Sequence, residues 1–146
     1  MPVKPPLYLQ ETDYSCAPAC LRMVLAAAGI EKTEEELRIV SNCDAEGTWP
    51  SEIVKTAKSL GFENSQRGPR DFDELKAALA EGIYPITYIK VRIGATGYFQ
   101  THAVIVTEIT PGKVFLLDPE RGEIEVLESD FLREWSAANH ETILVK

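Results

Sequence analysis

One stretch near the N-terminus, Gln10-Glu11-Thr12-Asp13-Tyr14-Ser15-Cys16-Ala17-Pro18-Ala19-Cys20-Leu21-Arg22-Met23-Val24-Leu25, carries much of the structural information in this chain. Apolar residues recur at helical spacing from Leu21 to Ala28, and Gly29 supplies a C-terminal stop. Pro18 is compatible with a helix only in the first turn, where its missing N–H costs nothing. The pattern therefore predicts a helix that begins near Ser15, with Cys16 at its N-terminus.

The segments on either side of this helix differ in their hydrophobic period. Three prolines within residues 1–14 indicate an extended arm. Helical spacing and capping patterns, such as Thr33 with Glu36 and Asp71 with Glu74, predict three more helices, at residues 33–40, 48–60 and 71–82. Runs rich in β-branched residues then predict strands at 84–91, 102–109, 113–117 and 123–127, a short helix at 129–135 and a last strand at 142–145.

This order of elements predicts the fold class and the organisation of the chain. Consecutive strands joined by tight turns form antiparallel sheets, so an α+β fold is expected, with N-terminal helices packed on a C-terminal antiparallel sheet. A length of 146 residues suits one domain. We expect a single domain over residues 1–146, comprising the arm (1–14), a helical half (15–82) and a sheet half (83–146).

Composition narrows the classes of function. Lys and Arg number 15 against 23 Asp and Glu, which gives a net charge of −8. No run of basic residues is visible, so nucleic acid and anionic membranes are not expected as partners, and a neutral or basic substrate is mildly favoured. No stretch approaches the roughly 20 apolar residues that span a bilayer. Three cysteines cannot all pair within one chain, which favours a reducing, cytoplasmic location.

Cys16 is the candidate nucleophile. A helix N-terminus favours the thiolate form of a cysteine through the macrodipole, and the thiolate is the reactive species. Cys20 lies one turn further on, among apolar positions, and is expected to be an inert core thiol. Cys43 falls in a polar loop. A lone cysteine at a helix start is usually structural, so this feature needs support from elsewhere in the chain.

His102 and Asp118 provide that support. His102 opens one predicted strand and Asp118 ends the next, and if residues 110–112 form a three-residue loop, position 104 faces 118. His102 and Asp118 then share one face of the sheet as diagonal neighbours, within side-chain reach. The expected geometry has Asp118 accepting from Nδ1–H of His102, with Nε2 facing the thiol. Taken singly, an edge histidine or an Asp-Pro turn is more often structural.

The remaining polar candidates are Gln10, His140 and the cysteines as metal ligands. Gln10 precedes Cys16 by six residues and either contributes its amide to an oxyanion hole beside the Cys16 N–H or is a solvated side chain on the arm. His140 is expected at the surface. The cysteines lack the paired spacing of structural zinc sites, so neither a metal nor a cofactor is expected.

The stretch from Gln10 to Leu25 resembles the N-terminal motif of the bacteriocin-processing peptidase family. Its members are papain-like cysteine peptidase domains, fused to ABC exporters, that remove double-glycine leader peptides. Thr101-His102-Ala103-Val104-Ile105-Val106, followed by Leu117-Asp118-Pro119, resembles the second signature of that family. The resemblance implies a papain-like fold with Cys16 as nucleophile, His102 as base, Asp118 as orienting acid and Gln10 as the oxyanion-hole side chain.

The resemblance also has limits. Many relatives have Asp-Cys-Gly at the nucleophile, where this chain has Ser15-Cys16-Ala17. No counterpart of the exporter domains is present in the sequence, so a stand-alone peptidase is expected, with association with an exporter left open. The predicted function is cleavage of a peptide or protein substrate through an acyl-enzyme. The alternatives are an acyl or peptidyl transferase with the same triad, and a non-catalytic peptide-recognition module.

Overall fold

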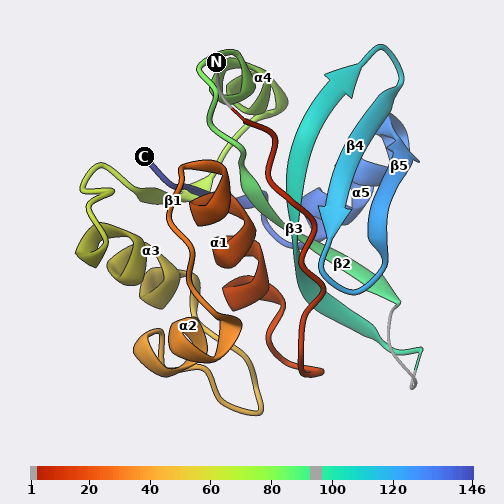
Figure 1. The fold of residues 1–146 in the computed structure, drawn as a ribbon. Helices are drawn as coiled ribbons and strands as arrows, with labels where there is room; N and C mark the ends of the chain where they lie inside the picture. The colour runs from red at the N-terminus through yellow and green to blue at the C-terminus, as the bar shows by residue number, and fades with distance from the viewer. Residues whose placement is uncertain (1–2, 93–96) are drawn as a thin grey trace.

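The computed structural model describes residues 3–92 and 97–146, which form five helices and six strands (Figure 1). The helices are α1 (Cys16–Ala27), α2 (Glu34–Val40), α3 (Pro50–Ser59), α4 (Phe72–Ala80) and α5 (Glu128–Ala137). The strands are β1 (Gln66–Pro69), β2 (Ile86–Arg92), β3 (Phe99–Thr110), β4 (Lys113–Asp118), β5 (Gly122–Leu127) and β6 (Glu141–Leu144). None of the helices in these described ranges is long and apolar enough to cross a bilayer.

The strands form one antiparallel sheet in the order β1-β6-β2-β3-β4-β5. The predicted antiparallel sheet is thus confirmed, as is the pairing of its consecutive strands β2, β3, β4 and β5. The chain enters the sheet earlier than predicted, because β1 lies inside the segment 15–82 that the sequence assigned to helices. β1 is a short edge strand containing Gly68 and Pro69, two residues that suppress a strand signal in the sequence.

Helices cover both faces of the sheet. Apolar side chains of α1, α2 and α3 share one core cluster with Ile86 of β2 and Ile105 of β3. The other face carries a second cluster, in which Leu75 of α4 and Trp135 of α5 pack against Val104 of β3. The N-terminal helices therefore do pack on the sheet as predicted, except that α4 joins α5 on the opposite face.

Helix α1 follows the predicted boundaries, and eight of its twelve residues are buried. Ser15 is its N-cap residue and Cys16 its first residue. Leu21 and Leu25 are fully buried. The Cys20 thiol lies 3.4 Å from the Ala103 carbonyl oxygen and hydrogen-bonds with it. This contact fixes α1 against β3 one residue away from His102.

The other helix ends agree only in part with their sequence signals. Asp71 and Glu74 form the full capping box of α4, as predicted. Thr33 accepts from the Glu36 N–H at the start of α2. Helix α3 begins at Pro50, with Trp49 as its N-cap residue, rather than at Thr48, since proline at the first helical position is already favourable.

The N-terminal arm has no regular secondary structure between Val3 and Gln10, in keeping with its prolines. It is nevertheless anchored on the sheet half of the chain. Lys4 forms an ion pair with Glu123 of β5. The Gln10 N–H donates to the Pro119 carbonyl oxygen at 2.7 Å. Gln10 is therefore held beside the residue that follows Asp118.

A β-bulge sets the register between β3 and β4. Thr110 pairs with Lys113, so the connecting loop contains two residues and the predicted three-residue loop is wrong. Continued without interruption, that register would place Ile105 opposite Asp118 and put His102 on the other face. The register shifts between Val106 and Glu108, and beyond it Ile105 pairs with Leu117. The extra residue therefore restores the predicted facing of 104 and 118.

We expect deletion of Thr107 to disrupt this register, whereas Thr107→Ala should preserve it. The alanine variant loses only the hydrogen bond from Thr107 Oγ1 to the Phe115 carbonyl (3.3 Å), which should lower the free energy of unfolding by about 1 kcal/mol. The deletion should lower the urea midpoint far more and abolish selective alkylation of Cys16. A deletion variant with wild-type stability and wild-type alkylation would show that the bulge does not determine the register.

Candidate active site

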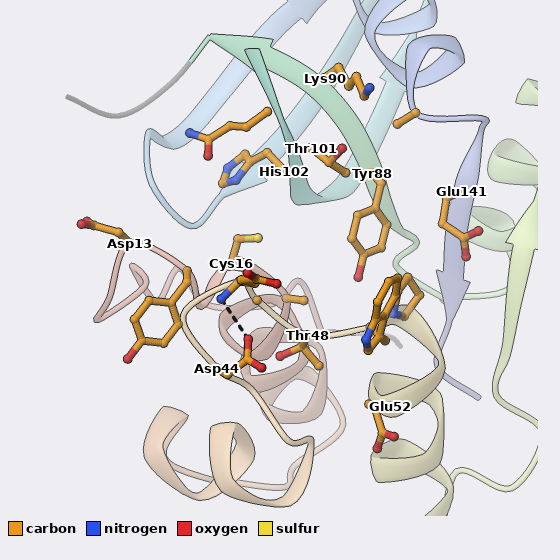
Figure 2. Close-up of a pocket in the computed structure, with 18 of the residues that line it drawn as sticks. Asp13, Cys16, Asp44, Thr48, Glu52, Tyr88, Lys90, Thr101, His102 and Glu141 are labelled. Carbon is orange, nitrogen blue, oxygen red and sulfur yellow. Dashed lines mark hydrogen bonds between the residues drawn. The ribbon is translucent and has the colours of Figure 1, made fainter. Parts of the chain in front are cut away.

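A cleft of about 860 Å³ lies between the start of α1 and the sheet (Figure 2). Cys16 lies on one wall, with Tyr14 and Ala17 beside it. Tyr88 of β2 and His102 of β3 lie on the opposite wall. The loop before α3 and the loop after α5 complete the lining. The cleft thus lies between the helical part of the chain and the sheet. Its lining includes Cys16, which the sequence predicted to be the nucleophile.

Cys16 and His102 meet across this cleft. The Cys16 side chain is half-buried and points toward the His102 ring (Figure 2). Cys16 belongs to the first turn of α1, whose leading N–H groups have no acceptor within the helix. The thiol therefore lies at the positive end of the helix dipole, on the side of the cleft that faces the His102 imidazole.

His102 is oriented by Asp118. The distance between His102 Nε2 and Asp118 Oδ1 is 2.7 Å, and both side chains are buried. The structure therefore brings these two residues together as the strand register predicted. The assignment of the ring nitrogens is the reverse of the expected one: Nε2 bonds to Asp118, which leaves Nδ1 for the thiol. The imidazole lies between Asp118 at the end of β4 and the start of α1. Residue spacing along the chain does not show which ring nitrogen faces which of the two.

The contacts of this pair shift both pKa values toward the charged forms. Burial alone lowers the pKa of His102, but hydrogen bonds with Asp118 and Cys16 outweigh it and raise the pKa to about 9. Burial alone raises the pKa of Asp118, but the hydrogen bonds from His102, the Glu120 N–H and Arg121 lower that pKa to about 2. The pair is therefore imidazolium and carboxylate at neutral pH.

Arg121 is a site residue that the sequence analysis missed. Its Nε lies 2.6 Å from Asp118 Oδ2, while Oδ1 of Asp118 accepts from the N–H groups of Glu120 (2.8 Å) and Arg121 (3.1 Å). The carboxylate is thus held from several directions by the turn that follows it. The available signal was the sequence Asp118-Pro119-Glu120-Arg121, an aspartate at the start of a turn with a cation three residues later.

Gln10 lies close to the turn that follows Asp118. Its side-chain amide already makes one hydrogen bond. Its Nε2 donates to the Thr12 carbonyl oxygen at 2.7 Å. Its Oε1 is buried and has no hydrogen-bond partner among the described residues. The structure thus excludes the alternative of a solvated glutamine on a free arm. An amide nitrogen carries two hydrogens, so one donor of Gln10 is left after the bond to Thr12.

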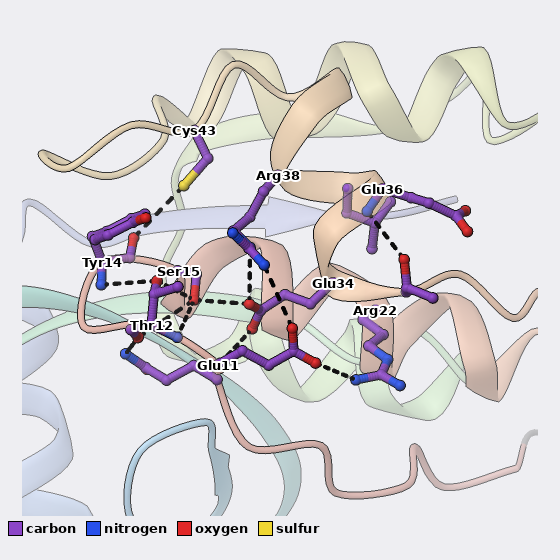
Figure 3. Close-up of polar contacts among 12 residues, drawn as sticks. Glu11, Thr12, Tyr14, Ser15, Arg22, Glu34, Glu36, Arg38 and Cys43 are labelled. Carbon is purple, nitrogen blue, oxygen red and sulfur yellow. Dashed lines mark hydrogen bonds and ion pairs between the residues drawn. The ribbon is translucent and has the colours of Figure 1, made fainter.

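The segment that leads into Cys16 is fixed by the buried carboxylate of Glu34 in α2 (Figure 3). Glu34 Oε1 accepts from the Glu11 N–H at 2.9 Å, and Oε2 accepts from Ser15 Oγ at 3.1 Å. Arg38 Nε forms an ion pair with the same carboxylate at 3.1 Å. Ser15 does not cap α1 with its side chain and instead uses its hydroxyl here. Glu34 therefore ties the loop before Cys16 to the second helix.

Tyr88 was also missed by the sequence analysis. It is 6% exposed and extends from β2 into the cleft beside Cys16 (Figure 2). Its hydroxyl is buried and has no hydrogen-bond partner among the described residues. A buried hydroxyl without a partner costs free energy, which a bound group that accepts or donates a hydrogen bond would recover. The alternating pattern of β2 predicts that the Tyr88 side chain points inward, but it cannot show that the side chain lines a cleft.

The lining of the cleft is acidic. Its carboxylates belong to Asp13, Asp44, Glu46, Glu52 and Glu141, against the cations of Lys90 and His102. Glu141 is paired with Arg67 by two hydrogen bonds (2.8 and 2.7 Å). The acidity that the sequence showed for the whole chain is thus also present around the candidate nucleophile.

The other residues considered from sequence lie apart from this chemistry. Cys20 is fully buried, and burial raises the pKa of its thiol well above the usual value. Burial also raises the pKa of Cys43. His140 is half-buried rather than at the open surface, because its ring packs edge-on against Trp135 at 4.6 Å between centroids. In the described part of the chain, no group of three or more His, Cys, Asp or Glu residues is placed to hold a metal ion.

Comparison with known proteins gives consistent matches over nearly the whole chain. A family model described as the Peptidase C39 family matches residues 4–144. The lactococcin-G-processing and transport ATP-binding protein LagD of Lactococcus lactis subsp. lactis is 30% identical over 127 residues, which is 87% of this chain and 17% of LagD. A protein of Methanothermobacter marburgensis is 30% identical over 118 residues, 80% of this chain and 73% of that protein. The chain therefore spans less than a fifth of LagD.

Solved structures share the fold at lower sequence identity. A C39-like peptidase from Bacillus anthracis superposes with a TM-score of 0.79 at 16% identity, covering 97% of this chain and 94% of that one. The peptidase domain of the Streptococcus bi-functional ABC transporter ComA gives 0.74 at 24% identity, with 95% and 96% covered. A double glycine motif protease from an AMS/PCAT transporter, solved with its leader peptide, gives 0.73 at 17% identity, with 99% and 94% covered. These likenesses establish the papain-like cysteine peptidase fold.

We expect Glu34→Gln to destabilise the protein and to loosen the loop before Cys16. A neutral amide cannot accept from both Glu11 and Ser15 while pairing with Arg38, so the free energy of unfolding should fall by about 2 kcal/mol. Urea denaturation measures this loss. Glu35→Gln, an exposed change on the same helix, is the matched control and should leave stability unchanged. Equal stabilities for the two variants would contradict the anchoring role of Glu34.

Asp118→Asn should destabilise the protein in a pH-dependent manner. The raised pKa of His102 (6.5 to about 9) contributes stability below about pH 6.5 that is lost as pH rises through 9. The lowered pKa of Asp118 (3.8 to about 2) contributes stability above about pH 4 that is lost as pH falls through 2. The difference from wild type should therefore peak between about pH 4 and 6.5, at about 3 kcal/mol.

Urea denaturation across this pH range provides the measurement for Asp118→Asn. Asp130→Asn, at a partly exposed carboxylate paired with Arg133, is the control and should give a small and flat difference. A flat profile for Asp118→Asn as well would show that the His102–Asp118 pair does not carry the pH dependence.

Proposed function

This chain belongs to the peptidase C39 family, and from that premise we propose that it is a cysteine peptidase that cleaves peptide bonds with a Cys16–His102–Asp118 triad. One observation carries the proposal. The thiol at the start of α1 points toward the His102 ring in the cleft (Figure 2), and Nε2 of that ring is hydrogen-bonded to a buried carboxylate. Nucleophile, base and orienting group thus follow one another in the order that covalent catalysis requires.

The reaction starts from a thiolate–imidazolium pair. The Cys16 sulfur attacks the carbonyl carbon of the substrate, and the electron pair of the C=O bond moves to oxygen. When the tetrahedral intermediate collapses, the C–N bond breaks and His102 gives its Nδ1 proton to the leaving amine. A water molecule then attacks the thioester, with His102 as the base that accepts its proton, and the carboxylic acid product leaves Cys16 free.

The oxyanion of the tetrahedral intermediate needs hydrogen-bond donors. The Cys16 N–H is in the first turn of α1, where it has no intrahelical acceptor. We assign the second donor to the Gln10 amide, whose backbone is fixed beside Pro119 and whose Nε2 retains a hydrogen beyond its bond to Thr12. The contact with Thr12 holds the amide in a fixed orientation, which favours a preorganised donor.

The proposed substrate is a peptide with a leader segment. Among the similar structures, a double glycine motif protease was solved with its leader peptide, and LagD is a lactococcin-G-processing protein. A peptide whose leader ends in Gly-Gly is therefore the first substrate to test. We also propose that this chain can act together with an exporter. Attack on the thioester by an amine in place of water would give peptidyl transfer by the same residues.

Selective alkylation tests the nucleophile. At neutral pH we expect iodoacetamide to modify Cys16 at least about tenfold faster than Cys20 or Cys43, whose thiols are kept protonated by burial. His102→Ala should remove this advantage. Mass spectrometry of the peptide fragments identifies the modified cysteine.

Cleavage of a Gly-Gly leader peptide tests the reaction itself. Wild type should release the two fragments, Cys16→Ala should release neither, and Cys43→Ala should retain wild-type turnover. Fast alkylation without cleavage of any peptide would leave a reactive thiol with no peptidase role and overturn the proposed activity. Peptide binding without fast alkylation would identify a non-catalytic recognition module.

A further inference from the structure

The hydroxyl group of Tyr88 is a buried polar group of the cleft that the proposed triad does not use. Tyr88 belongs to β2, is 6% exposed and extends into the cleft beside Cys16 (Figure 2). Its hydroxyl oxygen is buried and forms no hydrogen bond with any other described residue. Most buried polar groups in folded proteins are hydrogen-bonded, so an unpaired hydroxyl that is aimed into a cleft indicates contact with a ligand.

The surroundings of Tyr88 keep its hydroxyl protonated and leave it without an acceptor. Both carboxylate oxygens of Glu141, which lines the same cleft, accept from Arg67, at 2.8 and 2.7 Å. Burial raises the pKa of Tyr88 well above its usual value, and negative charge on Cys16 or Glu141 raises it further. The phenol is therefore neutral at physiological pH and carries one O–H donor that no described side chain uses.

The Tyr88 ring is held rigidly by the fold. Strand β2 lies inside the sheet, between β6 and β3, and Tyr88 pairs with Ala103, the neighbour of His102 along β3. The ring also packs in the core cluster that contains Ala17 and Cys20 of α1. A side chain that is already ordered loses little conformational entropy when it binds a ligand, so the hydroxyl is preorganised as a donor.

The proposed substrate shows which group can pair with this hydroxyl. Glycine has no side chain, so beside the scissile bond a Gly-Gly peptide offers only backbone N–H and C=O groups. Water can serve the hydroxyl in the open cleft, but a peptide that displaces this water has to supply the replacement acceptor, which is a carbonyl oxygen. In the proposed mechanism the scissile carbonyl already has two donors, the Cys16 N–H and the Gln10 amide, which leaves a neighbouring carbonyl for Tyr88.

We propose that the Tyr88 hydroxyl binds the peptide substrate by donating a hydrogen bond to the backbone carbonyl oxygen that directly precedes or follows the scissile carbonyl. The inference rests on the proposed peptidase function and adds a substrate-binding residue to it. Tyr88 reaches the peptide from β2, whereas Cys16 and Gln10 belong to α1 and the arm. The peptide backbone is thus held from both walls of the cleft, which fixes the scissile bond relative to the Cys16 sulfur.

Removal of the hydroxyl should weaken peptide binding without weakening the fold. Tyr88→Phe keeps the ring and removes a group that has no partner in the free protein, so the melting temperature should stay within about 1 °C of the parent protein or rise. In the Cys16→Ala background, the affinity for a fluorescein-labelled dodecapeptide with a central Gly-Gly should fall about fivefold, measured by fluorescence anisotropy.

Tyr8→Phe is the matched control for this change. The Tyr8 hydroxyl contacts Glu31 at 3.4 Å, and Tyr8 is not part of the cleft lining. The same loss of one hydroxyl should therefore leave peptide affinity unchanged. Equal affinities of the Tyr88→Phe protein, the Tyr8→Phe protein and their parent overturn the proposal, as does an absence of peptide binding to the parent.

A thioamide scan of the peptide identifies the carbonyl that Tyr88 contacts. Each backbone oxygen around the Gly-Gly pair is replaced singly by sulfur, which is a weaker hydrogen-bond acceptor. With Tyr88 present, sulfur at the contacted carbonyl should weaken binding about fivefold, whereas in Tyr88→Phe the same replacement should have almost no effect. Equal responses of the two proteins at every position overturn the proposal. A difference at the scissile carbonyl also overturns it, because Tyr88 would then belong to the oxyanion hole.

Cleavage kinetics provide a second measurement, in protein that retains Cys16. A hydrogen bond that is equally strong in the bound substrate and in the transition state raises KM when it is lost and leaves kcat unchanged. We therefore expect Tyr88→Phe to raise KM about fivefold at constant kcat, and Tyr8→Phe to change neither. A fall in kcat at constant KM would assign the hydroxyl to the reacting atoms and contradict a role in substrate binding.

The outcomes separate this contact from the function on which it rests. A position-specific thioamide response that depends on Tyr88, without cleavage by protein that retains Cys16, refutes the peptidase function and leaves the peptide contact standing. Cleavage by Tyr88→Phe with the wild-type KM, together with equal thioamide responses, refutes the contact and leaves the peptidase function standing.

Discussion

The hydrogen bond between His102 and the buried Asp118 depends on the register of two strands, and the candidate site is built around it. The bulge at Thr107 puts Val104 in line with Asp118, and only then do His102 and Asp118 share a face. Once buried, the carboxylate needs compensation, which it receives from His102, Arg121 and backbone N–H groups. The result is an imidazole with one orientation and a raised pKa, which faces the Cys16 side chain in the cleft.

The parts of the molecule around this contact hold Cys16 and His102 relative to each other. Helix α1 is fixed on β3 by the Cys20–Ala103 contact, and the loop before Cys16 is held by Glu34. The arm brings Gln10 to Pro119, so the proposed oxyanion donor is fixed to the same turn that carries the acid. Because each of these supports is a buried polar contact, losing one partner is costlier than the contact itself is stabilising.

Charged side chains around the candidate site are distributed unevenly. An acidic cleft and a basic pocket meet at Lys90, and Arg121 belongs both to the pocket and to the environment of Asp118. The other cations of this pocket are Arg92 and Arg133. The unpartnered Tyr88 hydroxyl in the cleft is a further group that a bound peptide backbone can satisfy.

Much of this could be predicted from local sequence signals, because helix starts, strand periods and turn residues act within a few positions. The α1 boundary at Ser15 and Cys16, the strands that carry His102 and Asp118, and the antiparallel α+β fold are of this kind. Other features depend on residues far apart in sequence: the edge strand β1 paired with β6, α4 on the face of α5, the roles of Tyr88 and Arg121, and the basic pocket. The choice of the His102 ring nitrogen that faces the thiol is also of this second kind, because it depends on how α1 is placed relative to the sheet. The sequence by itself therefore determined the elements and the reactive residue types, whereas tertiary packing decided the partners of each side chain, because contacts between distant elements leave no periodic signal along the chain.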